Sequence, residues 1–112
     1  MNSLQADRPS ISINVQTSVI TLHKKTLALI GDPEYIQILI NPSDKSIVVC
    51  VSNESDHLAH RVDIQCCKKS YRLYSKPLIQ SLIRLHPTWP YSRTFRIYGK
   101  YFSRLNIAKF SI

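Results

Sequence analysis

Apolar residues in the first half of the chain recur at every second position over short stretches, a pattern typical of β-strands with one buried face. Ile11, Ile13 and Val15, for example, are separated by single polar residues. The strands predicted in this half span residues 11–15, 19–22, 35–40 and 47–51. Residues 41–45, Asn-Pro-Ser-Asp-Lys, favour a bend, so the last two of these strands are expected to form a hairpin.

Two helices are predicted, one in each half. The first covers residues 24–30, where Leu27 and Ile30 lie three positions apart and Gly31 provides a stop signal. The second begins after Ser75, a residue suited to cap a helix N-terminus. Its apolar stripe at helical spacing consists of Leu78, Ile79, Leu82, Ile83 and Leu85. The strands predicted around it span residues 62–66, 71–74, 93–98 and 105–110, with a turn region over 99–104.

The two halves share one order of elements: strand, short helix, proline-bearing break, strand, turn and strand. We expect a single domain over residues 10–112 that follows a disordered N-terminus, residues 1–9. Its two pseudo-repeated units are residues 10–56 and residues 57–112. The predicted fold class is mainly β with two short helices (α+β), arranged as a small barrel.

Residues 19–51, VITLHKKTLALIGDPEYIQILINPSDKSIVVCV, resemble the half-repeat of the AbrB/SpoVT-type transition-state regulators. That family has a strand, a short helix ending in a Leu-Gly-like element, and a strand–turn–strand with an acidic turn. The corresponding parts of this chain are Leu27–Gly31, Tyr35–Ile40, Ser43–Lys45 and Ile47–Val51.

In that family two such units interleave into a swapped-hairpin barrel, usually from two chains. The MraZ proteins carry both units in one chain, and this chain resembles their tandem plan. The resemblance implies a DNA-binding regulator of transcription. Where the family's helix often has an arginine pair that touches DNA, this chain has Leu27-Ala28 or, with the alignment shifted, Lys24-Lys25.

Charge is distributed unevenly along the chain. Residues 1–56 contain four Lys or Arg and six Asp or Glu, a net charge of −2, whereas residues 57–112 contain eleven and one, a net charge of +10. Nine of the ten aromatic residues also lie in the second half. Basic groups interleaved with rings suit a polyanion with stackable bases, so nucleic acid is the expected partner, with duplex DNA favoured.

The candidate nucleic-acid-binding residues are Lys68, Lys69, Arg72, Arg93, Arg96, Tyr98, Lys100 and Arg104. On a strand, Arg96 shares a face with Thr94 and Tyr98, and such a face could contact phosphates. The alternative is a solvated basic surface that keeps the protein soluble and binds no partner. Trp89, Phe95 and Phe110 are expected in the core, whereas Tyr74, Tyr98 and Tyr101 are candidates for exposed stacking.

Other chemistry has little support in the sequence. His57 and His60 could share a metal, but adjacent Cys66 and Cys67 on a strand point to opposite faces, so we expect neither a metal nor a cofactor. Two glycines cannot build a Gly-rich phosphate loop, and the carboxylates are not paired, so an enzyme is not expected. The odd count of three cysteines, without a secretory signal or a membrane-length apolar run, favours the cytoplasm.

The predicted function is nucleic-acid binding by a transcriptional regulator or a mobile-element accessory protein. The alternative is a protein-interaction module, antitoxin-like or an assembly subunit, whose basic half meets an acidic partner. In the nucleic-acid-binding protein the acidic first half, with its apolar strands, would serve packing or dimerisation, so a homodimer is possible. The two functions differ in their salt dependence and in their preference for nucleic acid over acidic protein.

Overall fold

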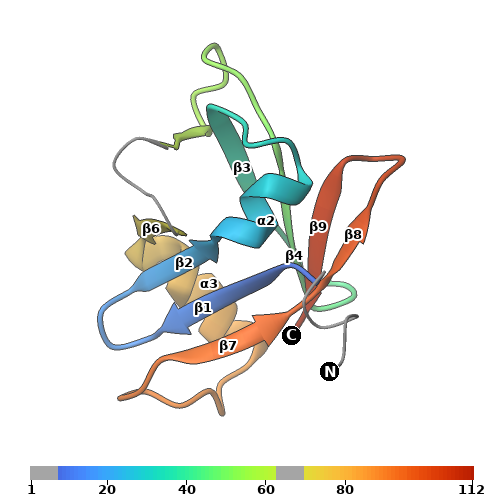
Figure 1. The fold of residues 1–112 in the computed structure, drawn as a ribbon. Helices are drawn as coiled ribbons and strands as arrows, with labels where there is room; N and C mark the ends of the chain where they lie inside the picture. The colour runs from blue at the N-terminus through green and yellow to red at the C-terminus, as the bar shows by residue number, and fades with distance from the viewer. Residues whose placement is uncertain (1–7, 63–69) are drawn as a thin grey trace.

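The computed structural model of the protein describes residues 8–62 and 70–112. Its elements, in chain order, are β1 (Ser10–Asn14), β2 (Val19–His23), α2 (Lys24–Leu29), β3 (Tyr35–Asn41), β4 (Ser46–Val51), β5 (His60–Arg61), β6 (Ser70–Tyr74), α3 (Lys76–Leu85), β7 (Phe95–Tyr98), β8 (Lys100–Phe102) and β9 (Ile107–Ser111) (Figure 1). The predicted fold class, mainly β with two helices, is confirmed.

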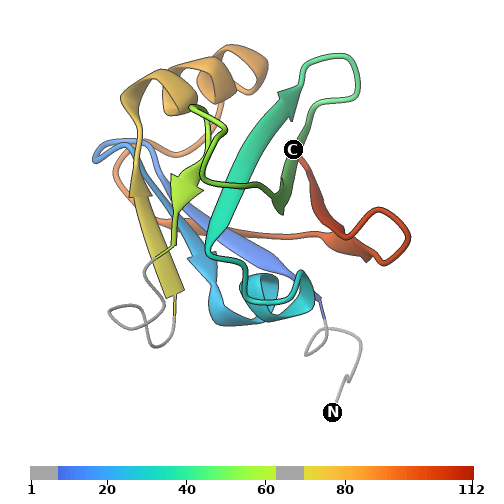
Figure 2. The ribbon, with the colours of Figure 1, turned by 90° about the horizontal axis from the view of Figure 1, so that it is seen from above.

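The strands form two antiparallel sheets (Figures 1 and 2). Sheet A has the strand order β6-β2-β1-β7, and sheet B has the order β5-β3-β4-β9-β8. The expected barrel needs a correction, because within residues 8–62 and 70–112 the pairing ends at edge strands in both sheets. The chain instead passes from one sheet to the other at Gly99, between β7 and β8.

The order strand–helix–hairpin occurs twice, as β2-α2-β3-β4 and as β6-α3-β8-β9 with β7 inserted. Each hairpin turn ends on a residue with positive φ, Lys45 and Asn106, both at 52°. In space, however, the two halves interleave, because β1 and β2 lie between β6 and β7 while β4 pairs with β9. The uneven charge along the sequence is therefore not a separation into two lobes.

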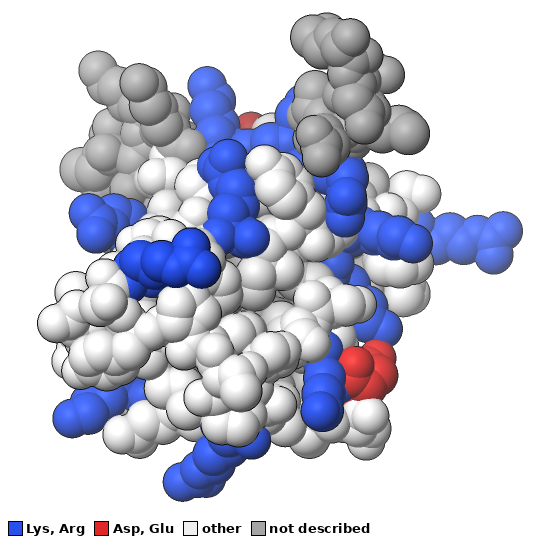
Figure 3. Space-filling model, turned by 90° about the horizontal axis from the view of Figure 1, so that it is seen from below, with Lys and Arg blue, Asp and Glu red and all other residues white. Residues whose placement is uncertain are grey.

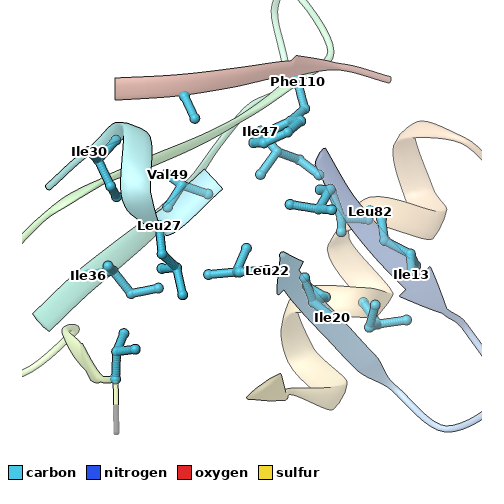
Figure 4. Close-up of a cluster of buried hydrophobic side chains, with 14 of the residues drawn as sticks. Ile13, Ile20, Leu22, Leu27, Ile30, Ile36, Ile47, Val49, Leu82 and Phe110 are labelled. Atoms are coloured by element: carbon cyan, nitrogen blue, oxygen red, sulfur yellow. The ribbon is translucent and has the colours of Figure 1, made fainter. Parts of the chain in front are cut away.

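The hydrophobic core takes side chains from both sheets and both helices (Figure 4). Ile13 and Ile20 come from sheet A, Ile47 and Phe110 from sheet B, and Leu82 from α3, and all five are almost fully buried. Alternation along each strand places these residues inward and leaves the polar positions of sheet A on its opposite face. The core thus fixes which face of sheet A is available to a partner.

The expected aromatic core residues do pack against this cluster. Phe110 is fully buried, and Trp89 and Phe95 are partly buried against the core. The Trp89 and Phe95 rings meet edge to face, with their centroids 5.0 Å apart. Cys50 on β4 is half-buried, and burial is the main cause that raises the pKa of its thiol.

Side-chain hydrogen bonds hold both helices in place. The Ser75 Oγ accepts a 3.3 Å hydrogen bond from the Leu78 N–H, which confirms the predicted N-cap of α3, a contact that stabilises a helix by about 1 kcal/mol. In α2, the buried Thr26 hydroxyl donates to the Ser10 carbonyl at 2.7 Å and accepts from the Ser10 N–H at 2.8 Å. This double contact joins α2 to the beginning of β1.

Three segments differ from the sequence-based expectation. Part of the turn predicted over 99–104 is β8, which pairs with β9, so the turn itself covers residues 103–106. Of the strand predicted over 62–66, only Val62 is described, and it follows the short strand β5. Of the N-terminus predicted to be disordered, Arg8 and Pro9 contact Gly99, through the Arg8 Nε and the Pro9 carbonyl, and residues 1–7 lie outside the described residues.

Candidate nucleic-acid interface

The outer face of sheet A, defined here as the side of its four strands turned away from the core, carries polar and aromatic side chains. The polar and aromatic side chains are Ser10, Ser12 and Asn14 of β1, Thr21 and His23 of β2, Ser70, Arg72 and Tyr74 of β6, and Arg96 and Tyr98 of β7, continued by Thr94; the apolar Val19 of β2 lies on the same face. None of them is acidic. A surface that combines hydroxyls, rings and arginines without carboxylates is suited to a polyanion.

The register of sheet A aligns its two arginines across the whole sheet. Arg72 pairs with Thr21, Thr21 pairs with Ser12, and Ser12 pairs with Arg96. The row therefore has small hydroxyl side chains on the two central strands and an exposed arginine on each edge strand. Three steps between neighbouring strands place the two arginine Cα atoms roughly 14 Å apart.

Tyr98 lies near two guanidinium groups. The Arg96 Cζ is 5.8 Å from the centre of the Tyr98 ring, and the Arg8 Cζ is 5.6 Å from it. Cation–π contacts of this kind stabilise by about 0.5–1 kcal/mol at exposed sites, so they help to order all three side chains before any ligand binds. Tyr98 is still 39% exposed, and Tyr74 on the opposite edge strand is 70% exposed.

Figure 3 shows the molecule from the side opposite to the one seen in Figure 2. Lys and Arg are spread across this side, whereas Asp and Glu occupy little of it. In the strand order of sheet A, both edge strands, β6 and β7, come from the basic half of the sequence. The positive field therefore extends beyond the arginines of a single strand.

A histidine lies within this basic environment. The His23 Nε2 and the Ser12 Oγ are 2.6 Å apart, which fixes the imidazole against the centre of sheet A. Burial is the first cause that lowers the pKa of His23, and the positive charge of Arg96 is the second. His23 is therefore mostly neutral at pH 7, and among the described residues of the face the positive charge is carried by arginine.

Lowering the pH is expected to destabilise the protein through His23 and His60, whose pKa values burial lowers from 6.5. A histidine with a lowered pKa binds its proton better in the unfolded chain, so stability is lost as the pH falls below about 6.5. Urea unfolding at about pH 8 and about pH 5.5 should show a lower midpoint in acid. Asp44 and Asp56, whose pKa values are lowered, titrate in the folded state only below 3.8, beneath this window.

The control for this prediction is the double variant His23→Gln and His60→Gln, which should show a smaller difference between the two midpoints. An equal difference in the variant and in the natural chain would contradict the assignment to these two histidines.

The structure brings three of the eight predicted contact residues together: Arg72, Arg96 and Tyr98 share the outer face of sheet A. Lys100 lies on β8 in sheet B, near Tyr98, and lines the same hollow as Arg8. Arg93 is exposed in the segment before β7, and Arg104 is exposed in the turn before β9, so neither lies on the outer face. Lys68 and Lys69 lie outside the described residues.

Sequence reasoning missed four residues of this region: Arg8, Ser12, Thr21 and His23. Arg8 falls in the segment predicted to be disordered, and the other three belong to the half assigned to packing. The alternation of polar and apolar residues along β1 and β2 indicates on which side of the sheet these side chains lie. It does not indicate which strands lie next to β1 and β2. Tyr101, a candidate for stacking, instead donates a hydrogen bond from its hydroxyl to the Asn106 Oδ1 at 2.8 Å and is half-buried.

Two further features of the described residues concern metal ligands and membrane-spanning helices. Within residues 8–62 and 70–112, no three His, Cys, Asp or Glu side chains are grouped as metal ligands, and Cys66 and Cys67 lie outside these ranges. No helix in the same ranges has both the length and the apolar character needed to cross a bilayer.

Comparison with known proteins gives no match for this chain, whether with family models, with curated proteins or with solved structures. The resemblance to AbrB/SpoVT-type regulators thus stays a prediction from the sequence.

Proposed function

We propose that the protein binds nucleic acid through the outer face of sheet A. The observation that carries this proposal is the row from Arg72 to Arg96, with an arginine on each edge strand, hydroxyls between them and no acidic residue among the described residues of the face. Arginine and hydroxyl side chains are the usual donors to phosphate oxygens, and the exposed rings of Tyr74 and Tyr98 add surfaces for stacking.

The spacing of the arginines favours duplex DNA. The separation of roughly 14 Å between Arg72 and Arg96 is comparable to the width of the major groove of B-DNA, about 12 Å. The two guanidiniums could therefore contact phosphates on both sides of one groove. Between them lie the half-buried Thr21 and the buried Ser12, whose Oγ is 2.6 Å from the His23 Nε2. Regulation of transcription, or an accessory role on a mobile element, would follow from such binding.

The test is binding to mixed-sequence duplex DNA, single-stranded DNA and RNA, measured by fluorescence anisotropy between about 50 and 200 mM salt. If Arg72 and Arg96 each neutralise one phosphate, the log–log slope of affinity against salt should be about −1.8 or steeper. Duplex DNA is expected to bind more tightly than either single strand.

Poly-glutamate of matched charge is the control for simple attraction between opposite charges. Poly-glutamate binding as tightly as DNA would transfer the proposal to an acidic protein partner. If folded protein binds none of the nucleic acids at low salt, the proposed function is wrong.

A further inference from the structure

A hollow of about 250 Å³ lies where the chain passes from β7 to β8, at one end of the outer face of sheet A. Its lining combines three cations, two rings and a hydroxyl: Arg8, Lys100, Lys109, Tyr98, Phe102 and Ser111. Gly99 completes the wall. The hollow shares Tyr98 with the outer face of sheet A. A nucleic-acid strand bound on that face could therefore extend into the hollow.

The tight crossing at Gly99 determines this arrangement. A Cβ atom at Gly99 would be 2.3 Å from the Lys109 carbonyl oxygen and 2.5 Å from the nearest Phe110 ring atom, closer than real contacts allow. The Gly99 N–H donates to the Pro9 carbonyl at 2.9 Å, and the Gly99 carbonyl accepts from the Arg8 Nε at 3.1 Å. These contacts place Arg8 beside Tyr98 and Lys100 although it is distant from them in sequence.

The charge of the hollow is positive. Lys109 is paired with Asp44, with 2.8 Å between the Nζ and the Oδ2, so this pair is nearly neutral. Neither Arg8 nor Lys100 forms an ion pair with a carboxylate of the described residues. Among residues 8–62 and 70–112, the Arg8 guanidinium makes one hydrogen bond, from its Nε to the Gly99 carbonyl. Two positive charges are therefore available to a ligand at the mouth of the hollow.

The rings provide the second half of a recognition site. Tyr98 is 39% exposed and Phe102 is 42% exposed, although large apolar side chains are usually covered. Both rings line the hollow beside the two cations. A ring next to a cation matches a ligand that carries a flat base and a phosphate on one unit.

We propose that this hollow binds a single unpaired nucleotide, its phosphate contacted by Arg8 and Lys100 and its base stacked on Phe102 or Tyr98. The inference rests on the proposed function, because it gives the outer face of sheet A a subsite for a strand end or an unpaired base. The volume is below the roughly 300–1,000 Å³ of sites for drug-sized ligands, which limits the occupant to about one nucleotide. A free mononucleotide presents the same chemistry as a nucleotide within a strand.

The experiment compares a blunt duplex with the same duplex carrying a short single-stranded overhang, by fluorescence anisotropy. The overhang should increase affinity roughly tenfold, the effect of one stacked base with its phosphate. Each of the variants Lys100→Ala and Phe102→Leu should remove this gain. The Phe102→Leu variant should still bind the blunt duplex as tightly as the natural chain does. Arg84→Ala, an exposed position on α3, is the matched control and should keep the gain.

The outcomes separate the hollow from the proposed function. Blunt duplex binding without any gain from the overhang overturns the nucleotide subsite and leaves the proposed function intact. If no duplex binds, titration with adenosine monophosphate and with inorganic phosphate decides the matter. If adenosine monophosphate binds saturably and Lys100→Ala abolishes this binding, the hollow is supported as a site for free nucleotides. Equal binding of inorganic phosphate, or no binding of either compound, overturns the proposal.

Discussion

Replacing Arg72 and Arg96 together with alanine is expected to weaken binding to duplex DNA roughly 10- to 100-fold. The same change should reduce the steepness of the salt dependence by about 1.8, since each neutralised phosphate contributes about 0.9 to the log–log slope. Both side chains are exposed and pair with no buried group, so the fold should be unaffected. Anisotropy titrations across a salt series, with circular dichroism to verify the fold, measure both quantities.

The matched control is the double variant Arg84→Ala and Arg93→Ala. It removes the same two charges from exposed positions that lie outside the outer face of sheet A. Its affinity should stay within a few-fold of that of the natural chain. If both double variants lose affinity equally, net charge alone controls binding and the row from Arg72 to Arg96 has no special role.

The second large effect is expected at Gly99. Gly99→Ala should lower the free energy of unfolding by about 3 kcal/mol or more, because the new Cβ would overlap the Lys109 carbonyl oxygen and the Phe110 ring. The Lys109 oxygen belongs to the backbone of β9, so relief would require β8 and β9 to separate. Such a loss is a large part of the 5–15 kcal/mol that typically stabilises a domain. Urea unfolding measures it.

Gly31→Ala separates steric overlap from the loss of glycine's conformational freedom. Gly31 has a φ of 95°, and a Cβ there would meet nothing within 4 Å, so the expected cost is only about 1–2 kcal/mol of backbone strain. A Gly99 variant that is no less stable than the Gly31 variant would show that β7, β8 and β9 do not approach as closely as described.

The sequence predicts local elements much better than their neighbours in space. Alternation located β1, β2 and β3 within a residue or two, and the capping residue Ser75 located the start of α3, because these signals act over a few residues. The strand at residues 100–102 was not predicted, because a three-residue strand after a glycine is too short to show an alternation of polar and apolar residues.

The candidate interface was predictable only in part, for a physical reason. The shared face of Arg96 and Tyr98 follows from the two-residue period of one strand. That Ser12 and Thr21 complete the row depends on the pairing of β1 with β7 and of β2 with β6, and no local pattern encodes it. Charge counted along the sequence therefore identified the edges of the face and missed its centre.

The interleaving of the halves also constrains how the protein assembles. Asn14 and Thr94 are hydrogen-bonded although they are 80 positions apart, and β1 is bordered on one side by a strand near the end of the chain. Long-range pairing of this kind slows folding, because a large loop must close before the contact forms. A chain still being synthesised would hold β1 and β2 without their outer neighbours, so the ability to bind would arise only after both β6 and β7 had been made.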